Sequence, residues 1–144
     1  MQHVLARANE IIQKYDTRDP IKLAELEGII VRNEFYEETK GYFINIFDSK
    51  YIVLNQALNE FMYLFVSGHE LYHALYHFQN DKVMLFEKGG FLTTNHDLFC
   101  ENTIYEREAN LFSYYLSEHI FTTYQNDLPE ELISYIQKNI LHNT

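Results

Sequence analysis

Three residues near the middle of the chain, His69, Glu70 and His73, form the pattern H-E-x-x-H within the stretch SGHELYHALYHF. On a helix, residues four apart lie on one face, so both imidazoles can bind a single ion. Glu70 lies one residue round from His69, displaced from the ion but within reach of a water bound to it. The spacing therefore predicts a metal site with a carboxylate beside it.

This donor set favours one Zn²⁺ per chain, although two histidines and a carboxylate would also accept iron, manganese or cobalt. A third protein ligand leaves a fourth position open to water, whose pKa zinc lowers to about 7. We expect Glu70 to accept a proton from that water and to return it to the leaving amine of a peptide bond. The pattern thus predicts peptide hydrolysis. The alternative is a metal-free helix whose histidines lie only at the surface or at the edge of the core.

The third ligand must come from another part of the chain. Glu106 and Glu108 stand near the start of a helix expected over residues 103–120, and glutamate oxygen suits zinc. Both also have an ordinary interpretation, because the helix dipole favours carboxylates in the first turn. Glu101, in the preceding loop, is a weaker candidate. The residues alone leave the choice between them open.

Two further histidines are candidates for supporting roles. His77 continues the series of His69 and His73, but each step of four residues adds about 6 Å along a helix axis, so one ion cannot easily bind all three. We interpret His77 as a donor that supports the site from outside the metal sphere, or as a partly buried histidine. His96, in the long loop, is a candidate for stabilising the developing oxyanion.

The order of sequence patterns predicts an α+β fold: a compact, zincin-like domain spanning residues 1–144, with helices around a small antiparallel sheet of three strands. The H-E-x-x-H pattern falls on the central helix. Asp19 and Thr103 are expected to cap two helices, with Glu106 completing a capping box. The expected elements are helices over residues 2–15, 20–28, 57–78, 103–120 and 129–141, strands over 29–35, 41–47 and 51–55, and a long loop over 79–103.

Composition limits the kind of partner. The net charge is -10, the pI is near 5.0 and no run of lysine or arginine is present, so direct nucleic-acid binding is not expected and a basic protein partner fits better. The single cysteine, Cys100, is typical of a reducing compartment. There is neither a signal-peptide pattern nor an apolar run of about 18 residues, so we expect a cytoplasmic protein that does not associate with membranes.

Taken together, HELYHALYH and YEREANLF resemble the ImmA/IrrE family of small cytosolic zinc metallopeptidases, whose pattern is H-E-x-x-H followed further along by E-x-x-A-N-x-F. The resemblance extends over about residues 1–120 and selects Glu106 as the third ligand, with Glu108 as the alternative, by position before Ala109 and Asn110. Where the family usually has glycine, this chain has Tyr72, which predicts a narrower active-site cleft.

The resemblance implies proteolysis of a helix-turn-helix repressor, as in anti-repressors of phages and mobile genetic elements. Other members of the family are partners of helix-turn-helix antitoxins. The alternative function is therefore a non-catalytic, zinc-containing binding module or toxin–antitoxin component that acts by association with such a partner. A fourth protein ligand, His77 or Glu108, would favour that alternative, because a closed zinc site leaves no position for water.

Overall fold

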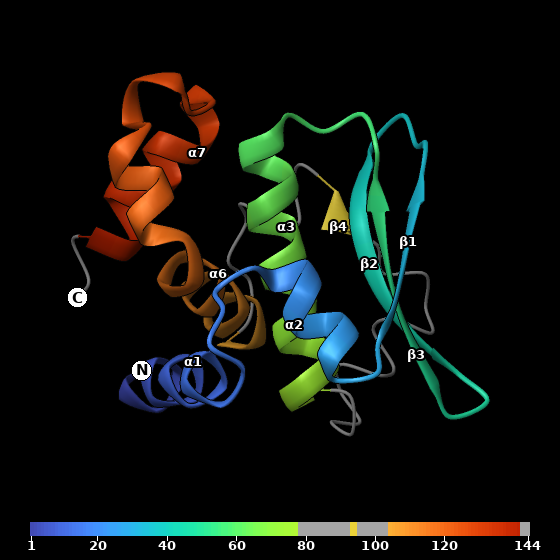
Figure 1. Ribbon diagram of the computed structural model, residues 1–144. Helices are drawn as coiled ribbons and strands as arrows, with labels where there is room; N and C mark the ends of the chain where they lie inside the picture. The colour runs from blue at the N-terminus through green and yellow to red at the C-terminus, as the bar shows by residue number, and fades with distance from the viewer. Residues whose placement is uncertain (78–92, 95–103, 142–144) are drawn as a thin grey trace.

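The computed structural model describes residues 1–77, 93–94 and 104–141. Figure 1 shows a sheet on one side of the central helix α3 and the helices α1, α6 and α7 on the other, with α2 beside α3. In chain order the elements are α1 (Gln2–Tyr15), α2 (Pro20–Leu26), β1 (Ile30–Glu34), β2 (Thr39–Ile46), β3 (Ser49–Asn55), α3 (Glu60–Tyr72), the π-helical turn η1 (His73–His77), β4 (Thr93–Thr94), α6 (Ile104–Thr123), the 3₁₀ turn η2 (Gln125–Asp127), α7 (Glu130–Tyr135) and the π-helical segment η3 (Ile136–Leu141).

The sheet has the strand order β1-β3-β2-β4, so the predicted α+β fold is confirmed but the purely antiparallel sheet is wrong. β2 and β3 form an antiparallel hairpin, and β1 pairs with β3 in parallel. Phe47 and Asp48, both with positive φ, make the tight turn of the hairpin. β3 therefore lies between β1 and β2. The pattern of residues within each strand does not reveal this order of pairing.

The bounds of α1 agree with the prediction, while α2 begins where predicted but ends at Leu26, two residues early. The Asp19 side chain accepts a hydrogen bond from the Ile21 N–H at 3.0 Å and so caps α2. Gly28, just after α2, has φ +80°, a conformation that glycine adopts without strain.

The central helix begins three residues later than predicted, because Asn59 accepts hydrogen bonds from the Phe61 and Met62 N–H groups and caps α3. From His73 onwards the predicted α-helix is instead the π-helical turn η1. The Lys50 ammonium from β3 donates to the Ala74 carbonyl inside this turn at 3.0 Å. α3 is therefore held from the sheet side at the point where its helical geometry changes.

The core lies on both sides of α3. Phe61, Phe65 and Leu71 are buried, as predicted, while Leu64 and Leu75 are only partly buried. α6 extends to Thr123, three residues beyond its predicted end, and its expected cap Thr103 and the predicted loop over 79–103, apart from β4, lie outside the described residues.

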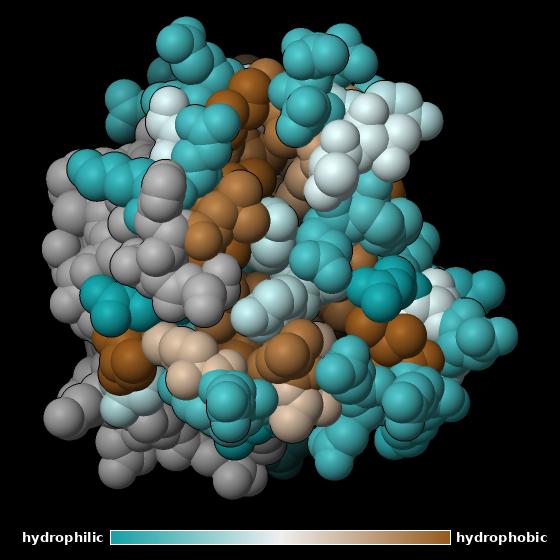
Figure 2. Space-filling model, turned by 90° about the vertical axis from the view of Figure 1, so that its left-hand side faces the viewer, coloured by the Kyte–Doolittle hydropathy of each residue, from teal (hydrophilic) through white to brown (hydrophobic). Residues whose placement is uncertain are grey.

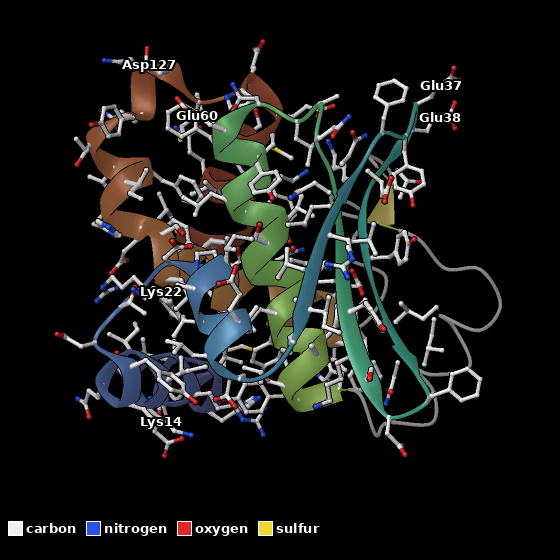
Figure 3. The ribbon with its side chains drawn as sticks, turned by 45° about the vertical axis from the view of Figure 1, so that its right-hand side comes forward. Lys14, Lys22, Glu37, Glu38, Glu60 and Asp127 are labelled. Atoms are coloured by element: carbon white, nitrogen blue, oxygen red, sulfur yellow. The ribbon has the colours of Figure 1, made fainter. Side chains whose placement is uncertain are left out.

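Acidic side chains gather at one end of the molecule. Glu37 and Glu38 project from the turn between β1 and β2, and Glu60 and Asp127 lie at the same end, opposite Lys14 (Figure 3). Glu60 and Asp127 also line a groove of about 570 Å³. Its apolar lining comes from Ile21, Phe61, Leu64 and Ile120.

The face formed by the helices is not uniformly polar. In Figure 2 a strip of apolar side chains reaches the surface there between polar ones. Among the helices that the structure describes, none is long and apolar enough to cross a membrane.

Candidate metal centre

The candidate site depends on how closely α3 and α6 approach each other. A Cβ atom on Gly68 would lie 2.4 Å from the Ser113 Oγ and 3.0 Å from the Ser113 Cα, so only glycine fits at this crossing. The Ser113 hydroxyl donates to the Phe65 carbonyl at 2.6 Å and ties the two helices together. Glu106 and Asn110 precede Ser113 by seven and three residues, so helical periodicity brings all three to the face directed at α3.

Three side chains meet beside this crossing, and all three are buried. The Nε2 atoms of His69 and His73 are 3.2 Å apart. One oxygen of Glu106 lies 3.1 Å from the His69 Nε2, and the other lies 2.9 Å from the His73 Nε2. Their ligand atoms all lie within 4.8 Å of one another, an arrangement that can hold a metal ion.

His69 is oriented by a pair of neutral groups. Its Nδ1 lies 2.7 Å from the Oδ1 of Asn110, which can only accept, so the Nδ1–H donates and the Nε2 atom faces the cluster. The Asn110 amide donates in turn to the Tyr135 hydroxyl at 2.8 Å. Asn110 and Tyr135 are both buried, so this support lies entirely inside the protein.

His73 is oriented by ionisable groups. Its Nδ1 lies 2.9 Å from the Nδ1 of His77, on the π-helical turn. The Nε2 of His77 lies 3.0 Å from one oxygen of Glu108, and the other oxygen of Glu108 lies 2.9 Å from the Nε2 of His3, on α1. Support on this side therefore runs outward to the protein surface.

Tyr72 also belongs to this outer network. Its hydroxyl donates to Glu108 at 3.3 Å and accepts from the Arg7 guanidinium at 2.7 Å. The ring is fully buried and packs against Phe112, with 4.8 Å between ring centroids. The side chain is thus packed between Phe112 and the Arg7–Glu108 network, and a narrowing of the active-site cleft by Tyr72 stays a prediction.

Glu70 lies beside the cluster and takes no place in it. The carboxylate oxygen nearest to His69 is 3.9 Å from its Nε2, and the residue is 1% exposed. A carboxylate in this position can accept a proton from a group held next to the cluster.

Strong electrostatic coupling marks the cluster. Burial alone would lower the pKa of His69, but the carboxylates of Glu106 and Glu70, with the amide of Asn110, raise it to about 9. Burial would raise the pKa of Glu106, but His69 and His73 hold it well below its usual range. The metal-free cluster thus pairs a protonated imidazole with a carboxylate, and a bound cation would replace that proton.

The outer network holds a neutral histidine next to a charged carboxylate. Burial and the neighbouring His73 lower the pKa of His77 to about 4, despite the opposing effect of Glu108. Burial would raise the pKa of Glu108, but hydrogen bonds from His3 and His77 lower it. Burial raises the pKa of Tyr72 to about 12, so its hydroxyl is a donor at neutral pH.

The structure brings His69, His73 and Glu106 together, with Glu70 adjacent. His77 and Glu108 lie one contact further out, while His96, Glu101 and Cys100 lie outside the described residues. Sequence reasoning missed the contacts of Asn110, Tyr135 and His3. Asn110 stands four residues after Glu106 and could have been found by helical spacing, whereas no local signal marks the other two.

Comparison with known proteins identifies the class to which this fold and cluster belong. The chain belongs to the Peptidase M78 family, whose model, described as the IrrE N-terminal-like domain, matches residues 24–137. The predicted ImmA/IrrE resemblance is thereby confirmed, and the family is one of metallopeptidases. α1, with His3 and Arg7, precedes the matched residues.

A relative from a phage is also similar to this chain. "Uncharacterized immunity region protein 2" of Bacillus phage phi105 is 29% identical over 126 residues, which cover 85% of this chain and 74% of that protein. No solved structure matches the chain.

Proposed function

We propose that this chain is a zinc-dependent endopeptidase in which His69, His73 and Glu106 hold one Zn²⁺. The convergence of their ligand atoms within 4.8 Å carries the proposal. Two imidazole nitrogens and a carboxylate oxygen are donors that zinc accepts in catalytic sites with an open position. When bound, zinc supplies a Lewis acid that activates water and polarises a peptide carbonyl.

Glu70 is the proposed general base and acid. Its carboxylate, 3.9 Å from the His69 Nε2, lies next to the ligands without displacing one of them. It accepts a proton from the attacking water and then donates it to the leaving amine. Its burial keeps bulk water away from the carboxylate that carries this proton.

The proposed substrate is a helix-turn-helix repressor of a phage or mobile genetic element. Support comes from the name of the phi105 relative, which places that protein in an immunity region. The acidic end formed by Glu37, Glu38, Glu60 and Asp127 is complementary in charge to a basic DNA-binding domain. A single domain over residues 1–144 and a cytoplasmic location stay predictions.

The test is Glu70→Gln, co-expressed with candidate helix-turn-helix repressors from the same genome. We expect zinc content to stay at about one ion per chain while cleavage falls by at least about a hundredfold. Glu10→Gln, an exposed position on α1, is the matched control and should cleave normally. Undiminished cleavage by Glu70→Gln would refute the assigned role.

The non-catalytic alternative requires a fourth protein ligand. The Glu108 carboxylate contacts His77, His3 and Tyr72, and the Nδ1 of His77 faces His73. Neither residue belongs to the cluster formed by the described residues, which favours an open site. X-ray absorption of the zinc-loaded protein would test this, since four protein ligands with no water would support the alternative.

A further inference from the structure

A series of contacts leads away from the metal cluster through its second histidine. The Nδ1 atoms of His73 and His77 are 2.9 Å apart. The His77 Nε2 lies 3.0 Å from one oxygen of Glu108, and the other oxygen of Glu108 lies 2.9 Å from the His3 Nε2. The first three of these residues are buried or have side chains that are at most 13% exposed. A role for this series rests on the proposed function, because it requires His73 to be a metal ligand.

The proton positions in this series depend on one another. Two imidazole nitrogens 2.9 Å apart can form a hydrogen bond only if one carries a proton and the other a lone pair. The Glu108 carboxylate only accepts, so the His77 Nε2–H donates to it. A neutral His77 then has its lone pair on Nδ1 and accepts from the His73 Nδ1–H. In the metal-loaded protein this would leave the Nε2 lone pair of His73 for the metal, whereas in the metal-free cluster the same atom lies 2.9 Å from an oxygen of Glu106.

The opposite arrangement would disable the ligand. Without an acceptor at the outer nitrogen, His77 can move its proton to Nδ1 and donate to His73. His73 would then carry its own proton on Nε2, the atom that must bind the metal. The choice of tautomer at His77 therefore determines whether His73 presents a lone pair or a proton.

We propose that Glu108 and His77 are positioning residues, and that Glu108 acts through His77 to hold His73 in the tautomer that binds metal. Glu108 is itself held by three donors, from His77, Tyr72 and His3. Two of these donors connect Glu108 to α1: His3 lies on α1 itself, and Tyr72 is hydrogen-bonded to Arg7 of α1. α1 therefore braces the metal site although it precedes the residues that match the family.

A double-mutant cycle with Glu108→Ala and His77→Asn tests the proposal. The asparagine Oδ1 can replace the His77 Nδ1 as acceptor for His73, but this shorter side chain cannot reach Glu108. Zinc affinity is measured by competition with a chromophoric chelator at fixed pH. In the wild-type background, Glu108→Ala should lower zinc affinity about 10- to 100-fold. In the His77→Asn background, the same change should alter it by no more than about twofold.

Two controls separate positioning from general damage. Glu118→Ala removes an exposed carboxylate from the same helix and should leave zinc affinity unchanged. Glu108→Gln keeps the shape of the side chain and an acceptor oxygen, and should lose less affinity than Glu108→Ala. Should Glu108→Ala fail to fold, the comparison of Glu108→Gln in the two backgrounds replaces it.

A spectroscopic readout reports the tautomers themselves. Imidazole ¹⁵N spectra of the zinc-loaded protein should show the proton of His77 on Nε2, and Glu108→Ala should give mixed tautomers at His77. His69 is an internal control, because Asn110 supports it separately, and its signals should not change.

The outcomes distinguish the two proposals. Equal losses from Glu108→Ala in both backgrounds, or no loss in either, would overturn the positioning role while leaving the zinc site intact. A wild-type protein that binds no zinc, or zinc binding unaffected by His73→Ala, would refute the proposed function itself.

Discussion

The two histidines of the cluster differ in how they are held. His69 relies on the amide of Asn110 and the hydroxyl of Tyr135, both buried and neutral at physiological pH. His73 relies on His77, Glu108 and His3, a series that contains charge and ends at a side chain that is 51% exposed. One ligand is therefore supported by the core, and the other is supported from the direction of the solvent.

This difference indicates that the site combines a rigid half with an adjustable half. Neutral hydrogen bonds in the core persist over a wide pH range and cannot exchange their roles easily. An imidazole and a carboxylate near the surface respond to solvent, salt and neighbouring charges. Substitutions on the two sides should consequently have different sizes and different sensitivity to salt.

The largest effect on zinc binding is expected from substitutions that remove a proposed metal ligand. His73→Ala and Glu106→Ala each delete one of the three proposed ligands, so zinc content should fall from about one ion per chain to less than about a tenth. Elemental analysis of protein purified without chelator measures this. Retention of zinc by Glu106→Ala would show that the third ligand lies elsewhere.

Gly68→Ala should affect both halves at once. A helical Gly→Ala change ordinarily stabilises by about 1 kcal/mol, but here the new Cβ would meet Ser113 at 2.4–3.0 Å. We expect a net loss of about 1–3 kcal/mol in the free energy of unfolding, measured by urea denaturation of the metal-free protein. Ser113→Gly in the same chain removes the atoms in the way and should restore part of the loss. A stabilised single variant would contradict the close approach of α3 and α6.

Asn110→Ala tests the rigid half. It removes the acceptor of the His69 Nδ1–H and leaves buried groups without their partner, so zinc affinity should fall about 10- to 100-fold. The loss should change little between low and high salt, in contrast to the loss from Glu108→Ala. Asn110→Asp keeps an acceptor oxygen and is the matched control. Equal salt dependence for the two sides would remove the distinction between a rigid and an adjustable half.

Tyr135→Phe should have a smaller effect on the same half. It removes one hydroxyl that accepts from the Asn110 amide but leaves the contact between Asn110 and His69. A loss of about 1 kcal/mol in thermal stability is expected, with zinc affinity lowered by less than about tenfold. A zinc affinity as low as that of Asn110→Ala would mean that Tyr135 determines the position of the amide.

His3→Ala should have the smallest effect and test the outer end of the adjustable half. The ring is half exposed, and its contact with Glu108 is screened by solvent, so zinc affinity should change by no more than about threefold at about 150 mM salt. The change should grow when the salt concentration is lowered. If His3→Ala lowered zinc affinity as much as Glu108→Ala does, the contact between His3 and Glu108 would be the main support of the network.

Part of the inner site could be predicted from local periodicity, because the spacing of His69 and His73 on one helix is visible in the sequence. The choice of Glu106 over Glu108 came instead from the resemblance to the ImmA/IrrE family, by position before Ala109 and Asn110. Of the outer series, only a supporting place for His77 was expected from the sequence. The series depends on the π-helical turn at His73–His77 and on a contact between Glu108 and His3, far apart along the chain.

The sheet shows the same limit. β1, β2 and β3 were visible from their β-branched and aromatic residues, but β4 falls within the predicted long loop, and the parallel pairing of β1 with β3 is a long-range choice. The start of α3 differed from its prediction for a local reason, since Asn59 is a better cap than the residues before it. Local chemistry thus predicts the elements, while tertiary contacts decide how they pair and where helical geometry changes.

The close crossing at Gly68 and Ser113 has a thermodynamic consequence. Two of the proposed ligands come from one side of that crossing and Glu106 comes from the other, so a cation held by all three is a crosslink between helices that the chain joins only through a long connection. Such a cation binds the folded protein in preference to the unfolded chain, and at about a thousandfold excess over its dissociation constant it would add about 4 kcal/mol to stability. The availability of metal in the cell would then govern how long the protein survives, as well as whether it cleaves.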